Sequence, residues 1–478
     1  MMDRSPFFAA CCIAATAVSV LLSGCNSAES RARQAYTEYQ AASAAGDLQG
    51  ARIALLQLVT AQDDVPSYWE ELGKLQLELH AYPDAYYAFN RAHELDRTNA
   101  GTLAAMTQLA LLGGNMDIAE QNARQLELLS PGHPAVRLAY GYVALRRTDL
   151  DKADEEADQL IENFPFDPSA KLLKARILMA RGDAAKAVAL LQDQVRSKPN
   201  DIGSLKALMT LLQHESDWRG VADVAARLGQ LQPKDKTWAV TAVDAAFRAN
   251  DIVSARRESE PLLTPAAAPD AVADVLDVWA KRWKTPEAIA EIRRVASRAT
   301  PQQRLAFATY FNEVGSPEDA QALAGGGPQL PINATNMSAN AIIADAIGQM
   351  GQASEAKRLF DAILAREPDH VYALRGRIKL EIRTGRAKAA ISDAQRLISV
   401  LPGSAPDRLL LARAYAAAGD ARQLDRTLWD AFHEIPANLE LYEVLRAHVR
   451  KTQGEDAVKS VDDEYRQQRD VNLAREFI

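Results

Sequence analysis

The sequence predicts an all-α protein built from stacked pairs of helices, and three observations support this fold class. The first is a run of prolines at an interval of 34 residues, which occurs in two parts of the chain. They are Pro131, Pro165, Pro199 and Pro233, and then Pro368, Pro402 and Pro436. A period of this length is typical of a helix-turn-helix unit that buries its apolar face only against copies of itself, so a solenoid is expected.

The second observation is a small side chain at a fixed place in the period. Stepping back twelve residues from each proline reaches Ala119, Ala153, Ala187, Val221, Ala356 and Ala390, and also Leu424, an exception whose role Ala421 would take. A small residue is needed where the second helix of a unit crosses the first closely. The third observation is composition: 48% of residues are hydrophobic but only 6% are aromatic, which suits a helical solenoid and gives no sign of disorder.

One unit, residues 66–99, resembles the tetratricopeptide repeat family closely. Its marker residues are Trp69, Leu72, Gly73, Ala85, Phe89 and Ala92. Extending this register predicts units that begin near 32, 66, 100, 134, 168, 202, 236 and 270, and then near 337, 371, 405 and 439. The resemblance implies a right-handed α-solenoid of about 12 to 13 repeats, and it implies nothing specific about function.

The N-terminus is similar to a bacterial lipoprotein signal. Arg4 precedes an apolar run from Phe7 to Leu22, and the sequence Leu22-Ser23-Gly24-Cys25 follows. The run is short for a membrane span. The resemblance therefore implies a signal peptide over 1–24, lipidation at Cys25 and a lipidated tether over 25–33. An ordinary signal peptide with an incidental cysteine remains the alternative.

Two further residue types bear on this N-terminal prediction. The only other cysteines are Cys11 and Cys12, inside the predicted signal, so no disulfide is possible within the mature chain. In lipoproteins of this kind, aspartate after the acylated cysteine is associated with retention in the inner membrane, and here the residue is Asn26. The resemblance thus implies lipid anchoring at the periplasmic face of the outer membrane in a Gram-negative cell, although exposure at the cell exterior stays open.

Interruptions of the 34-residue spacing divide the expected solenoid. We predict an N-terminal solenoid over 34–300, a degenerate repeat with a Gly/Pro-rich joint over 301–336, and a C-terminal solenoid with capping helices over 337–478. Prolines between 261 and 269 demand a longer loop between helices, and Gly325-Gly326-Gly327-Pro328 with Pro331 breaks any helix. The glycine run is either a flexible joint or an enlarged turn.

Partners of such arrays dock in the groove lined by the first helix of each unit, and two parts of this face are candidates. The early units offer a mixed apolar and basic strip suited to a peptide, made of Leu138, Tyr142, Arg146, Leu172 and Arg176. The alternative for these residues is a place in the core.

The later units offer a basic stripe on one helix face, made of Tyr372, Arg375, Lys379 and Arg383 with Arg413 from the next unit. In a chain of formal net charge -8 such a stripe would attract an acidic segment or an anionic polysaccharide. The alternative is a solvated face that Glu381 or carboxylates on an adjoining helix partly neutralise.

Catalytic patterns are not found in the sequence. The seven histidines include no HExxH, and no nucleophile elbow, phosphate-binding loop or dinucleotide fingerprint occurs. The acidic run from Asp151 to Asp158 is best explained as a solvated helix face, and Trp279 with Trp283 as filling in an irregular repeat rather than an exposed aromatic pair. We therefore expect no enzyme, no cofactor, no metal site and, given the acidity, no nucleic-acid partner.

The functional hypothesis is a non-enzymatic, lipid-anchored periplasmic scaffold that binds envelope proteins or their peptide segments in its groove. By layout it resembles accessory lipoproteins of exopolysaccharide export, pilus assembly or secretion. Two alternatives are a chaperone-like adaptor for outer-membrane proteins, which would use the apolar strip, and a direct binder of an anionic polysaccharide, which would use the basic stripe. A purely structural spacer is a further possibility.

Overall fold

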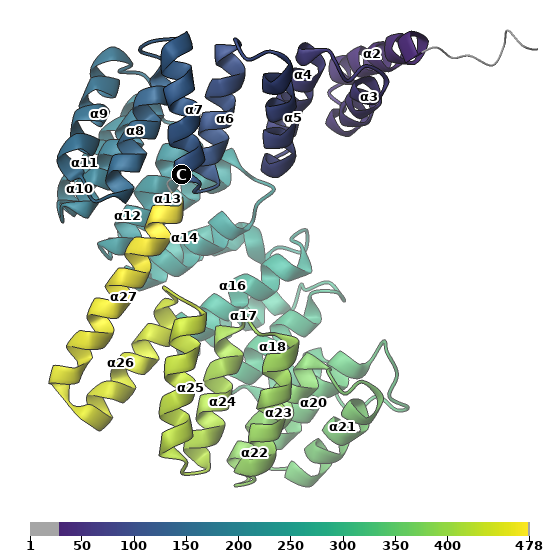
Figure 1. Ribbon diagram of the computed structural model, residues 1–478. Coiled ribbons are helices and arrows are strands. Elements are labelled where there is room, and N and C mark those ends of the chain that lie inside the picture. Colours follow the sequence, from purple (N-terminus) through teal and green to yellow (C-terminus); the bar gives the residue numbers. More distant parts are fainter. Residues whose placement is uncertain (1–27, 477–478) are drawn as a thin grey trace, which may run out of the picture. The chain divides into compact units, whose positions relative to one another are not determined.

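The computed structural model describes the backbone of residues 28–476 and side chains as far as residue 468. This part of the chain contains 26 α-helices and no strand (Figure 1). It divides into two compact units, unit 1 up to Asp183 and unit 2 from Ala184 onward. The predicted signal peptide and Cys25 lie outside the described residues.

Unit 1 contains nine helices within the described residues. They are α2 (Ala28–Ala44), α3 (Leu48–Ala61), α4 (Pro66–Glu78), α5 (Tyr82–Leu95), α6 (Ala100–Leu112), α7 (Met116–Leu129), α8 (Pro134–Arg146), α9 (Leu150–Asn163) and α10 (Pro168–Ala180).

Unit 2 continues the helical pairs and adds one 3-10 turn, Glu260–Leu263. Its helices are α11 (Ala184–Ser197), α12 (Ile202–His214), α13 (Trp218–Leu231), α14 (Thr237–Arg248), α15 (Ile252–Ser259), α16 (Pro269–Arg282), α17 (Pro286–Ala296), α18 (Arg304–Glu313), α19 (Pro317–Leu323), α20 (Met337–Gln349), α21 (Ala353–Arg366), α22 (Val371–Arg383), α23 (Ala387–Val400), α24 (Ala405–Ala417), α25 (Ala421–Glu434), α26 (Leu439–Gln453) and α27 (Glu455–Glu476).

The helix boundaries confirm the predicted register. First helices begin at residues 66, 100, 134 and 168 in unit 1, and at 337, 371, 405 and 439 in unit 2. The second helices follow the same period. The 26 described α-helices form 13 pairs, which confirms the predicted count of about 12 to 13 repeats. The short pair α18 and α19 is the repeat between residues 301 and 336.

The turn between the two helices of a pair has the same chemistry in several repeats. The side chains of Asp47, Asn115 and Asp149 each accept a hydrogen bond from a backbone N–H of the first turn that follows, which satisfies an otherwise unpaired donor. The residue before each cap has positive φ, with 69° at Gly114 and 60° at Thr148. The repeat therefore needs a left-handed residue here, which glycine adopts without a steric penalty.

Close helix crossings explain the small side chains. The predicted residues Ala119, Ala153, Ala187, Ala356 and Ala390 are completely buried. Gly73 has the same role in the best-preserved repeat, because a Cβ atom there would lie 2.9 Å from the ring of Phe89. Small residues at these crossings thus let neighbouring helices pack closely around larger buried side chains.

The degenerate region of unit 2 is packed and not open. Helix α15 ends early, and the chain reaches α16 through the 3-10 turn and a loop, as the prolines predicted. The amide of Gln303 holds this loop by donating to the carbonyls of Thr264 (3.0 Å) and Ala267 (2.7 Å). Trp279 is 1% exposed and donates to the Ser259 hydroxyl at 2.8 Å, which confirms that this tryptophan fills an irregular core.

The glycine-rich segment forms a loop between α19 and α20. Its backbone is anchored at Gln329, whose N–H donates to the side chain of Asn340 at 2.8 Å and whose carbonyl accepts from the same amide at 3.0 Å. Asn340 is completely buried. These contacts describe an enlarged turn inside unit 2, while the mobility of this segment and the boundaries at 300 and 336 stay predictions.

Candidate functional site

A groove of about 440 Å³ lies along the first helices of unit 2. Helices α16, α18, α20, α22, α24 and α26 each contribute lining residues. Four residues of the predicted stripe line it, namely Tyr372, Arg375, Lys379 and Arg413, and Arg383 follows one turn after Lys379. We call this feature the unit 2 groove.

Helix α22 presents the stripe because of simple helical spacing. Arg375, Lys379 and Arg383 are four residues apart, so they fall on one face of the helix. The helix begins at a fixed place, since the side chain of His370 accepts a hydrogen bond from the Ala373 N–H at 3.3 Å. The opposite face of α22 is apolar and enters the core.

Arg375 is held by a carboxylate from the next repeat. Its Nε donates to Asp407 Oδ1 at 2.7 Å and its Nη2 to Oδ2 at 2.8 Å, which is a two-pronged pair. Asp407 is 1% exposed. Hydrogen bonding to this carboxylate raises the pKa of the Arg375 guanidinium. The pair joins α22 to α24, and a partner that binds Arg375 would compete with Asp407.

The other two stripe cations on α22 are also paired, with carboxylates from preceding first helices. Lys379 contacts Glu313 of α18, and Arg383 contacts Asp345 of α20 at 3.4 Å. Burial raises the pKa of the Asp345 carboxyl, although the neighbouring Lys379 and Arg383 act in the opposite direction. The three cations of the stripe on α22 therefore form an ionic network between repeats.

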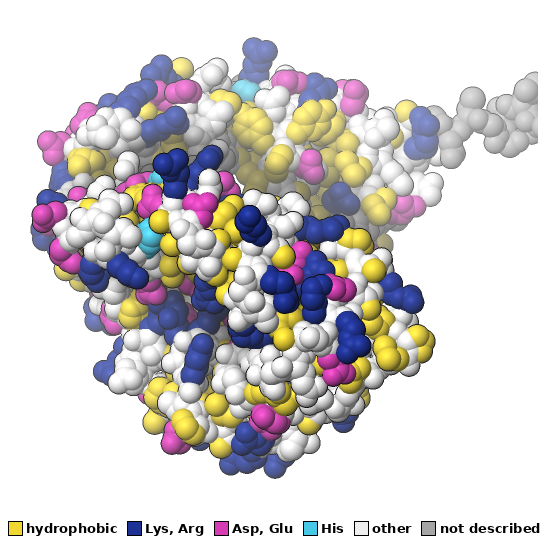
Figure 2. Space-filling view, turned by 90° about the horizontal axis from the view of Figure 1, so that it is seen from below, with side chains coloured by type: hydrophobic (Ala, Val, Ile, Leu, Met, Phe, Trp, Pro, Cys, Tyr) yellow, Lys and Arg dark blue, Asp and Glu magenta, His cyan; other side chains and the backbone are white. Residues whose placement is uncertain are grey.

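Two lining cations carry no ion pair or hydrogen bond among the residues that the structure describes. They are Arg413 of α24, whose side chain is exposed, and Lys284, just after α16. Tyr372 is 42% exposed beside them. Across the lining, carboxylates and cations are equal in number, and the face drawn in Figure 2 likewise shows charges of both signs interspersed.

Sequence reasoning missed the identity of the neutralising carboxylates. Glu381 does not have this role: it is 4% exposed on another face of α22, where burial and Asp393 raise its pKa. The partners Glu313, Asp345 and Asp407 lie 66, 38 and 32 residues from the cations they contact. In the sequence these three carboxylates are marked only by their positions on the first helices of nearby repeats.

The predicted strip of unit 1 belongs mainly to the core. Leu138 and Tyr142 are 9% and 5% exposed, and burial raises the pKa of the Tyr142 hydroxyl. Arg176 is 8% exposed and its guanidinium carbon lies 5.0 Å from the centre of the Tyr142 ring, a cation–π contact between two repeats.

The two remaining strip residues are partly accessible. Arg146 donates to the Gly114 carbonyl at 3.3 Å, and Leu172 is half-buried. The structure brings the five strip residues onto neighbouring first helices of unit 1 but leaves little of Leu138, Tyr142 or Arg176 for a ligand.

The acidic run of α9 is likewise paired. Lys174 contacts Asp154 and Asp158 at 2.6 Å each, and Arg181 contacts Asp151 and Asp154 at 2.9 Å each. These bridges join α9 to the following pair, which is more specific than the solvated face that the sequence suggested.

Two searches of the described residues gave no candidate site. No group of three or more His, Cys, Asp or Glu side chains between residues 28 and 468 is arranged to hold a metal ion. None of the helices described is long and apolar enough to cross a membrane.

Comparisons with solved structures give neighbours of low sequence identity. Pseudomonas aeruginosa PilF has 15% identity over 46% of this chain and 98% of its own, with a TM-score of 0.32. A tetratricopeptide repeat protein from Parabacteroides merdae has 13% identity over 59% and 98%, with a TM-score of 0.29. MamA has 17% identity over 35% and 92%, with a TM-score of 0.31. No curated protein sequence matches the chain.

The family comparison is more specific. Two stretches of the chain, residues 138–202 and 343–407, match the tetratricopeptide repeat family. Each stretch spans about two of the helix pairs described above, and the first helices from α4 to α12 and from α20 to α26 begin 34 residues apart. These two stretches are therefore tetratricopeptide repeats, and they lie within a continuous series of helix pairs.

Proposed function

We propose that this protein is a lipid-anchored periplasmic scaffold that holds envelope proteins through the unit 2 groove, in the assembly of an export or secretion complex. Tetratricopeptide repeat proteins bind protein partners. The observation that carries the proposal is the groove itself, where exposed Tyr372 and Arg413 lie beside a network of satisfied ion pairs.

The charge of the groove favours a peptide of mixed composition. Because Arg375, Lys379 and Arg383 already contact carboxylates, a polyanion would have to replace three internal partners. The polysaccharide alternative thus has less support than a peptide with one acidic group for Arg413 and an apolar side chain for Tyr372.

The chaperone-like alternative also loses support. It requires an accessible apolar strip for unfolded clients, yet Leu138 and Tyr142 pack in the core of unit 1. An extended apolar client would find little accessible area on this face.

The groove is tested by crosslinking in cells, followed by recovery of the full-length protein, with Arg413→Glu as the variant. Arg422→Glu is the matched control, because Arg422 is also exposed but does not line the groove. We expect a small, defined set of envelope proteins that is lost with Arg413→Glu and retained with Arg422→Glu. Equal recovery from both variants would contradict the groove, and recovery of many unrelated outer-membrane proteins would favour the chaperone alternative.

A triple substitution of Arg375, Lys379 and Arg383 is a poor test. It would leave Asp407 and Asp345 buried without their cations, so a loss of binding would also follow from a damaged fold. The single exposed arginine avoids this ambiguity.

The anchor is tested separately at Cys25. In Cys25→Ser, we expect the protein to leave the membrane fraction, and mass spectrometry of the parent protein should show an acylated N-terminal cysteine. Continued sedimentation of Cys25→Ser with outer membranes would show that lipid is not the main anchor.

A further inference from the structure

The second helices of unit 1 carry a graded surface. Ile53, Tyr87, Gln121 and Glu155 are 34 residues apart, lie on α3, α5, α7 and α9, and are all exposed. Ile53 and Tyr87 are 53% and 60% exposed, which is high for large apolar side chains. One repeat position thus changes from apolar through polar to acidic with distance from the N-terminus.

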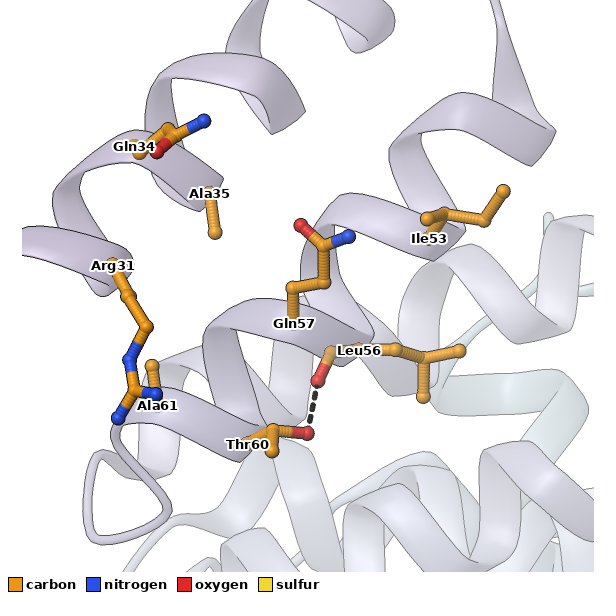
Figure 3. Close-up of a pocket in the computed structure, with 8 residues that line it drawn as sticks. All are labelled: Arg31, Gln34, Ala35, Ile53, Leu56, Gln57, Thr60 and Ala61. Carbon is orange, nitrogen blue, oxygen red and sulfur yellow. Dashed lines mark hydrogen bonds between the residues drawn. The ribbon is translucent and has the colours of Figure 1, made fainter. Parts of the chain in front are cut away.

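A hollow of about 490 Å³ surrounds the first of these residues. Figure 3 shows that its walls come from Arg31, Gln34 and Ala35 on α2 and from Ile53 to Ala61 on α3. Leu56, one turn after Ile53, is a further 40% exposed. The hollow is therefore mainly apolar and has a cation at its edge.

A second hollow, of about 540 Å³, adjoins the first at Thr60, which borders both. Tyr87 lies on its wall, with its ring edge-on to buried Trp69 and the ring centres 6.0 Å apart. This contact holds Tyr87 in place with its outer part exposed. Ile53, Leu56 and Tyr87 together form what we call the N-terminal apolar surface.

Charge follows the same gradient. Helix α3 has a single charged residue, Arg52, which donates to Gln49. Helix α9 carries six carboxylates and one lysine. A negatively charged surface would therefore repel the exposed side of α9 but not that of α3.

The described chain begins close to the predicted anchor. Helix α2 starts at Ala28, three residues after Cys25, and three extended residues span about 10 Å at most. Arg31, at the edge of the first hollow, is one turn into α2. If Cys25 carries lipid, the bilayer lies within reach of the N-terminal apolar surface.

We propose that the N-terminal apolar surface docks on the phospholipid bilayer that holds the anchor, so that unit 1 rests on the membrane by α3 and α5 and leaves it towards α9. This inference rests on the proposed lipid anchor. Aliphatic side chains and a tyrosine suit the boundary between headgroups and acyl chains, and such contacts add to the hold of an acyl group. Docking would fix the direction in which the repeats extend from the membrane.

The test measures depth at four matched positions. The acylated mature protein would contain no free thiol, because Cys11 and Cys12 fall in the predicted signal. Single variants Ile53→Cys, Tyr87→Cys, Gln121→Cys and Glu155→Cys are labelled with an environment-sensitive fluorophore. Each is reconstituted in vesicles of phosphatidylethanolamine and phosphatidylglycerol that contain a lipid-borne quencher, and flotation of the vesicles reports the anchor independently.

We expect the quencher to lower fluorescence at least about twofold at positions 53 and 87, less at 121, and not at 155. Vesicles that float with labelled protein but give equal signals at all four positions would overturn the docking and leave the anchor intact. Protection of positions 53 and 87 from an aqueous quencher, without lipid quenching, would also overturn it, since a protein would then cover the surface. Protein that fails to float would refute the proposed anchor and, with it, this inference.

Discussion

Two rows of side chains at the same repeat position have opposite roles in the two units. In unit 1 the position is filled by Tyr142 and Arg176, which are buried and stack on one another. In unit 2 it is filled by Asp345, which is also buried, and by Lys379 and Arg413, and all three line a groove. The helical frame is the same in both, so the comparison teaches that a place on the first helix does not by itself define a binding residue. The size and charge of the neighbours one repeat away decide it.

The largest expected effect is the loss of stability when the buried Tyr142 is removed. Tyr142→Ala should lower the free energy of unfolding of unit 1 by about 3–5 kcal/mol, because it removes a buried aromatic ring. Lys379→Ala, at the matching position of unit 2, should cost less than about 1 kcal/mol, since its ion pair is partly exposed. Hydrogen exchange of α8 and α22 would report the two units separately, and equal losses of protection would contradict the assignment.

A second effect concerns the ionic network. Asp407→Ala should destabilise unit 2 by about 1–3 kcal/mol, less than for a fully buried pair because the Arg375 side chain is 38% exposed. The double variant Arg375→Leu with Asp407→Ala should recover part of the loss, as no unpaired charge remains. Urea unfolding of the four proteins forms a double-mutant cycle, and strict additivity would show that the pair contributes nothing.

The arginines at this repeat position provide a smaller contrast. Arg176→Met should cost about 0.5–2 kcal/mol, because it removes a cation from the face of a buried ring. Arg413→Met should change stability by less than about 0.5 kcal/mol, as expected for an exposed side chain. Thermal unfolding of both variants checks this, and a large loss for Arg413→Met would mean that this residue supports the fold.

The last prediction concerns how the contribution of Asp345 to folding stability changes with pH. Burial raises the pKa of the Asp345 carboxyl in the folded state, so the folded protein binds this proton more tightly than the unfolded chain does. The contribution of Asp345 to stability should therefore fall as pH rises from the ordinary aspartate range to the raised pKa, and stay constant above it. Asp345→Asn should lack this component. The difference in urea midpoint between parent and variant, followed against pH, would contradict the prediction if it kept one value throughout.

Much of the fold was predictable because the repeat is a property of spacing along the chain. The proline interval predicted the beginnings of α8, α10, α12, α22, α24 and α26, and the alanines twelve positions before the prolines are buried at the helix crossings. Irregular segments were predictable only as interruptions. The short pair α18 and α19, and the anchoring of the glycine-rich loop by Asn340, depend on side chains that no period marks.

The candidate site was predictable in part. Four of the five stripe residues do line one groove, since spacings of four residues fix a helix face. Their availability was not predictable, because Asp407, Asp345 and Glu313 come from other repeats and local sequence does not reveal the pairing.

By itself the sequence determined the repeat length and the order of the helices, because these follow from periodicity. It also determined which residues lie at close crossings and which residues share one face of a helix, because these follow from side-chain size and spacing. Only the tertiary structure decided that Tyr142 is core, that Arg375 is paired and that Arg413 is exposed without a partner among the residues described. The reason is physical: burial and ion pairing depend on which atoms lie within a few ångströms, and in a solenoid those atoms belong to residues roughly one repeat away.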